Sequence, residues 1–101
     1  MKIEQMQENA QAASRLLKSL ANPHRLMILC HLVRGEHAVG ELEELVGLGQ
    51  SALSQHLARL REEGIVSCRR EAQKVYYSLK DDKAASVLQA LYGLYCSNGG
   101  D

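Results

Sequence analysis

Apolar residues recur near the start of the chain with the spacing of one helical face. The stripe, whose members lie three or four positions apart, consists of Ile3, Met6, Ala10, Ala13, Leu17 and Leu20. This period predicts an amphipathic first helix over residues 1–20. Asn22 and Pro23 then favour a new helix start, because Asn caps well and Pro suits the first helical position. From Pro23 to about Arg34 most positions are apolar, so we expect this second helix to lie in the core.

The middle of the chain predicts two helices joined by a tight turn. Residues 39–46 (VGELEELV) place their apolar side chains on one face, and Gly47-Leu48-Gly49 follows as the turn. Residues 50–63 resume helical spacing, and Gly64 should end that helix. Two helices connected by a glycine turn are a candidate helix-turn-helix unit.

Strand-like and helical patterns complete the chain. Residues 65–70 and 74–79 are rich in β-branched and aromatic side chains and are separated by Glu71-Ala72-Gln73, which predicts a two-stranded hairpin. Asp81 or Asp82 should cap a last helix with its own apolar stripe, ending near Cys96. The expected fold is mainly α with a small β-hairpin, a winged helix-turn-helix (ααααββα) in a single domain over residues 1–101.

Composition and charge narrow the function classes. A chain of 101 residues has little room for an internal active-site cleft, and it lacks both a CxxC motif and a βαβ pattern, so we do not expect an enzyme. Three well-separated cysteines and the absence of a long apolar run indicate a cytoplasmic protein with free thiols and no membrane segment. The net charge is zero, but residues 51–80 carry six positive and three negative side chains. This local basic excess is compatible with nucleic-acid binding.

The sequence resembles the ArsR/SmtB family of winged-helix repressors. The resemblance covers about residues 10–96 and is carried by LLKSLANPHRLMILCHL and by AVGELEELVGLGQSALSQHLARLREEGIVSCRREAQKVYYSL. It implies a transcription regulator that binds a double-stranded DNA operator through residues 38–80. It also implies a homodimer formed by residues 1–20 and 81–97, which agrees with apolar stripes too extensive to pack on one small core.

The predicted DNA contacts lie on the helix that begins near Gln50 and on the hairpin. Short and amide side chains in the first turns of a helix can reach base edges in the major groove, and wing cations can bind phosphates. The predicted contacts are Ser51, Ala52, Ser54, Gln55, His56, Arg59, Arg69, Arg70, Gln73 and Lys74. The alternatives are that the helix simply has a solvated polar face and that the hairpin charges only prevent edge-to-edge aggregation.

The metal sites of the resembling family are not preserved. The thiolate pair of its arsenic- and cadmium-type members falls on Ala38 and Gly40, which cannot bind metal. Its zinc-type set falls on Asp81, Lys83, Leu94 and Ser97, so at most one of about four required ligands remains. His24, His37 and His56 are scattered and are interpreted as surface or capping residues. We therefore expect no metal and no cofactor.

Two cysteines occupy positions that suggest sensing. The segments LMILCHL and LYGLYC resemble the subgroup of this family that senses sulfide, persulfide or oxidants through a dithiol, which implies that Cys30 and Cys96 form the sensor. A disulfide or polysulfide link between them would release the operator, and Cys68 would be a spectator.

Other interpretations of the cysteines and of the regulator stay open. Cys30, expected to be largely buried, could be a small core residue and Cys96 an incidental thiol. The protein could also be a metal-responsive repressor, a redox-insensitive anti-repressor or activator, or a winged-helix module for protein contacts.

Overall fold

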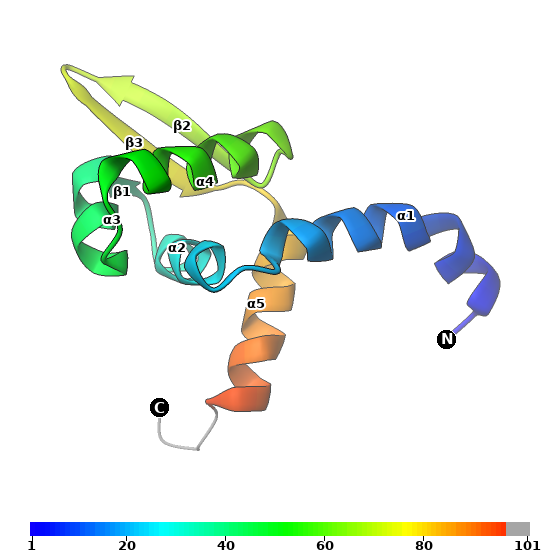
Figure 1. Ribbon diagram of the computed structural model, residues 1–101. Coiled ribbons are helices and arrows are strands. Elements are labelled where there is room, and N and C mark those ends of the chain that lie inside the picture. Colours follow the sequence, from blue (N-terminus) through cyan, green and yellow to red (C-terminus); the bar gives the residue numbers. More distant parts are fainter. Residues whose placement is uncertain (97–101) are drawn as a thin grey trace.

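The computed structural model describes residues 1–96, which form five helices and a small sheet (Figure 1). In chain order the elements are α1 (Ile3–Leu20), α2 (Pro23–Val33), β1 (His37–Ala38), α3 (Val39–Val46), α4 (Gln50–Glu62), β2 (Val66–Glu71), β3 (Lys74–Leu79) and α5 (Asp82–Tyr95). The predicted winged helix-turn-helix order is confirmed.

The junction of α1 and α2 forms as the sequence predicts. Asn22 caps α2, because its Oδ1 accepts hydrogen bonds from the backbone N–H groups of His24 (2.9 Å) and Arg25 (3.1 Å). Arg25 then reaches back across the junction and donates from Nε to the Ser19 carbonyl at 2.7 Å. This bond occupies one of the carbonyls left free at the C-terminal end of α1 and links that end to the start of α2.

The core lies where α2, α3, α4 and α5 meet the hairpin. Its buried residues are Leu20, Ile28, Leu29, Leu32, Leu42, Leu53, Leu57, Leu60, Ile65, Val66, Ala84 and Leu88. The second helix is less enclosed than its apolar sequence suggests, because Met27 and Cys30 lie on an exposed face of α2. The expectation that Cys30 is largely buried is therefore wrong for this chain.

The sheet has three strands in the order β1-β3-β2, all antiparallel. In the hairpin, Val66 pairs with Leu79 and Glu71 pairs with Lys74. Strand β2 therefore begins and ends one residue later than the predicted range 65–70. Ala72 adopts a left-handed φ of 56° in the tight turn between the strands. The short strand β1 was not predicted, and it pairs His37 with Tyr77 and Ala38 with Tyr76.

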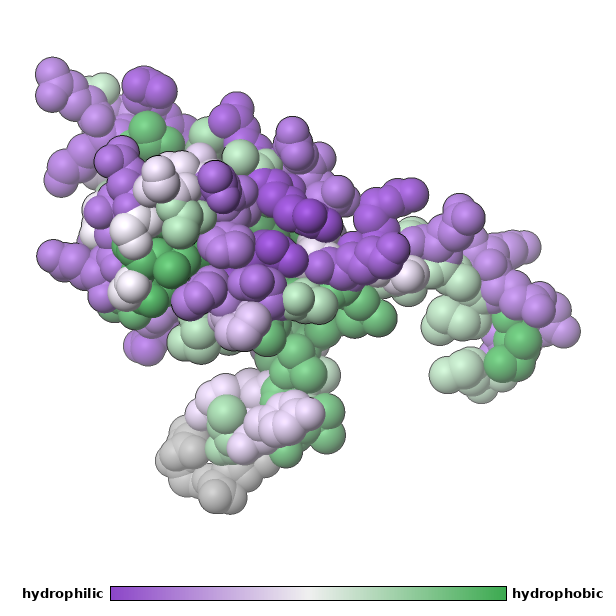
Figure 2. Space-filling view, in the orientation of Figure 1, coloured by the Kyte–Doolittle hydropathy of each residue, from purple (hydrophilic) through white to green (hydrophobic). Residues whose placement is uncertain are grey.

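Helices α1 and α5 project from the body in different directions (Figure 1). Figure 2 shows hydrophobic atoms gathered on the underside of α1 and where α5 leaves the body. Apolar side chains on both helices stay largely exposed, with Leu17 at 56% and Leu94 at 77% of their maximum. The predicted dimerisation segment 81–97 is described only to Cys96, so Ser97 lies outside the described residues.

Candidate nucleic-acid interface and thiol groove

Helix α4 presents a polar face to solvent. Leu53, Leu57 and Leu60 point into the core, and the opposite face leaves four of the predicted DNA contacts exposed. These are Ser51, Ser54, Gln55 and Arg59. Ala52 is half-buried. The helix begins after Gly49 with no side-chain cap, so its first N–H groups receive no side-chain acceptor.

A groove of about 680 Å³ joins the start of α4 to the hairpin. It is lined by residues of β1, α3, α4, β3 and the turn between β2 and β3, including Gln50, Ser54, Gln73 and Lys74. The groove thus brings Ser54 of α4 together with Gln73 and Lys74 of the hairpin, while the other predicted contacts of α4 do not line it. Two carboxylates, Glu41 and Glu44, also line the groove.

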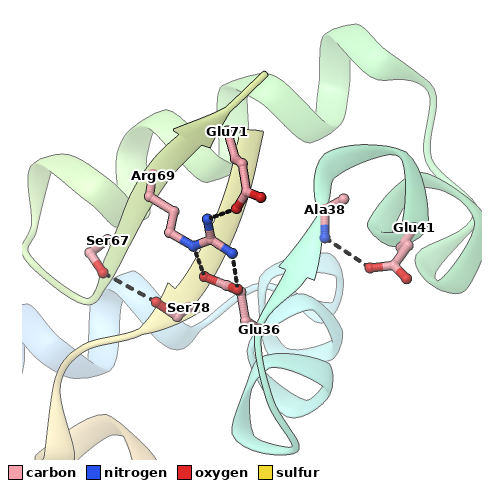
Figure 3. A network of polar contacts seen from close by, with 7 residues as sticks. All are labelled: Glu36, Ala38, Glu41, Ser67, Arg69, Glu71 and Ser78. Carbon is pink, nitrogen blue, oxygen red and sulfur yellow. Dashed lines mark hydrogen bonds and ion pairs between the residues drawn. The ribbon is translucent and has the colours of Figure 1, made fainter. Parts of the chain in front are cut away.

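Glu41 is fixed at the start of α3. Its Oε1 accepts a hydrogen bond from the Ala38 backbone N–H at 2.9 Å (Figure 3). This bond is the main cause of a lowered Glu41 pKa, followed by the contact with His37. Glu41 is therefore ionised at neutral pH and offsets part of the positive charge of Lys74 nearby.

His56 lies on α4 but faces back toward α2. Its Nδ1 is 3.5 Å from Nη1 of Arg25, and its ring centroid is 5.9 Å from that of His24. Burial lowers the pKa of His56, and the positive charges of Arg25 and His24 lower it further. His56 is thus less free to meet a DNA base than the exposed residues of α4.

The hairpin residues predicted to contact DNA differ in how they are held. Arg70, Gln73 and Lys74 are exposed, and neither Arg70 nor Lys74 forms an ion pair within residues 1–96. Arg69 instead donates to both carboxylate oxygens of Glu36, at 2.8 and 2.9 Å, and to Glu71 (Figure 3). The hydrogen bonds from Arg69 to Glu36 and Glu71 raise the pKa of Arg69, so its charge is permanent and already paired.

A second groove, of about 470 Å³, lies where α2 packs against α5. It is lined by Cys30, His31, Val33, Arg34, Leu88, Gln89 and Tyr92. Cys96 is the C-terminal cap of α5 and, like Cys30, has an exposed thiol. Desolvation by neighbouring protein atoms raises the pKa of Cys30, and the charge of the nearby Cys96 thiolate raises it further. Both predicted sensor thiols are thus exposed, Cys30 in this groove and Cys96 at the end of α5, the helix that lines the other side of the groove.

Comparison with known proteins explains this combination of features. Residues 22–67 match the model of the bacterial regulatory protein arsR family. A biofilm growth-associated repressor from Xylella fastidiosa is 48% identical over 94 residues, which cover 93% of this chain and 82% of that protein. The chain belongs to the ArsR family. It is a transcriptional regulator of that family and not an enzyme.

Solved structures of ArsR-family members share the whole fold. The crystal structure of the repressor BigR from Xylella fastidiosa matches with a TM-score of 0.93 at 47% identity, covering 97% of this chain and 100% of that chain. Reduced HlyU from Vibrio cholerae matches with a TM-score of 0.87 at 47% identity, covering 93% of this chain and 99% of that chain. The resemblance to the BigR and HlyU subgroup is thereby confirmed.

The positions of the ArsR-family metal sites have other structural roles here. Ala38 is the N-cap of α3, and Gly40 lies in its first turn. Asp81 caps α5 by accepting hydrogen bonds from the backbone N–H groups of Lys83 and Ala84. Within residues 1–96 no three His, Cys, Asp or Glu side chains lie together as a metal site would require. No helix in this range is long and apolar enough to cross a membrane.

The sequence pattern missed the residues that hold the predicted ones in place. Glu36 contacts Arg69, which lies 33 positions further along the chain. Arg25 contacts His56, which lies 31 positions further along. Local spacing carries no signal of such contacts. The sequence shows Glu36 only as a charged residue after Gly35 at the end of the second helix, which indicates no partner.

Proposed function

We propose that this ArsR-family regulator is a homodimer that binds operator DNA with α4 and the hairpin and releases it when Cys30 and Cys96 become linked. The observation that carries DNA binding is the exposed polar face of α4, which shares one groove with the hairpin in a fold common to named repressors. A helix presented in this way fits the major groove, while hairpin cations reach phosphates.

The proposed DNA contacts separate into two kinds. Ser51, Ser54, Gln55 and Arg59 would approach base edges and flanking phosphates from α4. Arg70, Gln73 and Lys74 would contact the backbone beside the minor groove. Ala52 is the apolar member of the set and suits contact with a thymine methyl group.

Exposed apolar stripes support the homodimer. Ile3, Met6 and Leu17 on α1 and Tyr92, Leu94 and Tyr95 on α5 are each between 47% and 83% exposed. Water contact with such side chains is unfavourable by about 25 cal/mol per Å² of apolar area. Pairing these helices across a two-fold axis would cover them and place two copies of α4 about one DNA turn apart.

The packing of α2 against α5 supports the thiol switch. Cys30 opens into the groove between these helices, and Cys96 caps α5 within electrostatic reach of it. A link between the two would tie α2 to the dimerisation helix α5 and change the spacing of the DNA-reading helices. A coupling of about 1–3 kcal/mol would weaken operator binding by about 5–150-fold.

The proposed chemistry uses a sulfane-sulfur donor such as inorganic polysulfide. The Cys96 thiolate attacks a terminal sulfur, forms a persulfide S–S bond and releases a polysulfide that is one sulfur shorter. The Cys30 thiolate then attacks Sγ of Cys96, the persulfide bond breaks, HS⁻ leaves and a disulfide forms. The sulfane sulfur is reduced to HS⁻ as the two thiols are oxidised. Condensation of two persulfides with loss of HS⁻ would leave a trisulfide link instead.

The order of attack rests on Cys30 being the weaker nucleophile. Its raised pKa leaves less thiolate at neutral pH, although its thiol is exposed. Cys68 is half-buried in β2 opposite Tyr77 and has no part in the proposed switch.

The sign of regulation is proposed as repression, because the similar protein from Xylella fastidiosa is named a repressor. Activation by competition with another DNA-bound protein is the alternative, since HlyU is named a transcriptional activator. One HlyU structure is that of the reduced protein, a redox-defined form of this relative, which favours a redox-responsive role here.

The test is an anisotropy titration of the reduced protein with DNA from upstream of its own gene. We expect salt-sensitive, sequence-selective binding, and at least about 5-fold weaker binding after polysulfide treatment. Selective binding without a polysulfide effect would overturn the switch but keep the DNA-binding function. Absence of selective binding would overturn both and favour a winged-helix module for protein contacts.

A further inference from the structure

Arg69 spans the sheet from one edge to the other. It leaves β2, passes over the ring of Tyr76 in β3 with Cζ 4.6 Å from the ring centroid, and reaches Glu36, which lies just before β1. Tyr76 is flanked by Arg69 on one side and by Ala38 of β1 on the other. The side chain therefore ties the hairpin to the segment that leaves the helical body (Figure 3).

The contact has the geometry of a strong surface ion pair. Nε and Nη2 of Arg69 donate to the two oxygens of Glu36 in a parallel fork, and Nη1 donates to Glu71. Such two-point pairing fixes orientation as well as distance, and the stack on Tyr76 restricts the guanidinium further. With two carboxylates bound, Arg69 adds little net attraction toward a phosphate.

We propose that Arg69 is a positioning residue that clamps the wing to the helical body in the orientation needed for DNA, while Arg70 and Lys74 make the phosphate contacts. The proposal deepens the proposed function and rests on it. Glu36 is the essential partner, because it lies in the segment between α2 and β1, whereas Glu71 belongs to the same hairpin as Arg69. Without Glu36 the hairpin would still pack on the core through Val66, Tyr77 and Leu79, and its protruding part would be oriented by backbone pairing with the two-residue strand β1.

Glu36→Gln and Glu71→Gln form a matched pair of variants for this clamp. Each removes one negative charge per protomer, so long-range attraction to DNA rises equally in both. Only Glu36→Gln breaks the tie to the body. We expect Glu36→Gln to bind operator DNA about 5-fold more weakly with an unchanged salt slope, and Glu71→Gln to bind as tightly as the parent or more tightly.

Arg69→Lys separates positioning from charge. Lysine keeps the positive charge but lacks the fork that pairs with both oxygens of Glu36, so it should behave like Glu36→Gln. If Arg69 instead contacts phosphate, both Gln variants bind more tightly than the parent and Arg69→Lys keeps most of the affinity. That result would overturn the proposal.

Hydrogen exchange of the free protein tests the clamp independently of DNA. Exchange of the wing amides between Arg70 and Val75 should rise about 3-fold in Glu36→Gln, with an unchanged unfolding midpoint. Unchanged exchange in this variant would overturn the clamp, even if DNA binding is confirmed. A parent protein that binds no operator would overturn the proposed function, and the exchange experiment would still decide whether the clamp exists.

Discussion

Individual side chains at the candidate interface differ in how free they are to meet DNA. Gln55 and Lys74 are exposed and form no side-chain hydrogen bond or ion pair within residues 1–96, whereas His56 is turned toward Arg25 and Arg69 is bound by Glu36. The sequence pattern predicts the position of each residue on its element. It could not predict which of them are already engaged, because the partners come from distant parts of the chain.

Gln55 and Lys74 should have separable effects on DNA binding. Gln55→Ala should mainly reduce discrimination between operator and mutated sites, by about 1–3 kcal/mol, because an amide can pair with a base edge. Lys74→Ala should weaken binding to all sequences and flatten the plot of log K against log salt by about 0.9 per lost phosphate contact. Titrations at several salt concentrations check both, and an unchanged site preference in Gln55→Ala would remove Gln55 from the reading residues.

His56 should make the stability of the fold depend on pH. Its folded-state pKa lies below the ordinary value because burial and the charges of Arg25 and His24 disfavour protonation. The unfolded chain therefore binds the proton more readily, so stability is fully present above about pH 6.5 and is lost as pH falls. Urea unfolding at about pH 7.5 and about pH 5.5 should show a smaller loss in His56→Gln than in the parent. An equal loss in both proteins would contradict this assignment.

At the scale of elements, the hydrophobic periodicity predicts all five helices and the hairpin. It misses β1, because a two-residue strand has no periodicity and exists only where β3 offers a free edge. It also predicts that Cys30 is buried, whereas Cys30 is exposed, because α2 carries more apolar side chains than the core of one chain can bury. The same excess leaves Met27 exposed, and Cys30 and Val33 line the groove beside α5.

Gly64 is the residue on which the change from α4 to β2 depends. Its φ of 75° lies in the left-handed region, and a Cβ added at this position would meet no other group within 4 Å, so strain and not collision limits substitution. We expect Gly64→Ala to reduce the free energy of unfolding by roughly 1 kcal/mol. Gly40→Ala in α3, where φ is not left-handed and space is equally open, should be neutral or stabilising in the same urea titration. Equal effects of the two substitutions would contradict the role given to Gly64.

At the scale of the whole molecule, the two projecting helices α1 and α5 keep apolar side chains exposed that a single chain does not cover. Their exposed apolar residues lie outside the core, and the groove between α2 and α5 opens beside one of them (Figure 2). Sequence periodicity predicts these stripes correctly. Sequence periodicity cannot predict the geometry of the proposed dimer, because the spacing of apolar residues does not determine the angle at which helices of two chains cross.

Leu17 tests the proposed dimer directly. Leu17→Glu places a charge in the exposed stripe of α1 and should raise the dimer dissociation constant by about 100-fold or more, because both copies are affected. The matched substitution Gln11→Glu, at a polar position of α1, should leave association unchanged. Sedimentation over a range of concentrations measures both constants. Equal association of the two variants would show that α1 does not form the interface.

In the proposed switch, one link between Cys30 and Cys96 controls DNA binding. The most direct measurement is operator affinity, with intact mass on the same sample, before and after polysulfide treatment of Cys30→Ser, Cys96→Ser, Cys68→Ser and the parent. We expect all four to bind DNA when reduced, and only the parent and Cys68→Ser to gain an intrachain link and lose affinity by about 5–150-fold. Normal DNA release by Cys30→Ser would contradict the two-thiol switch and assign the signal to a single modified cysteine or to another site.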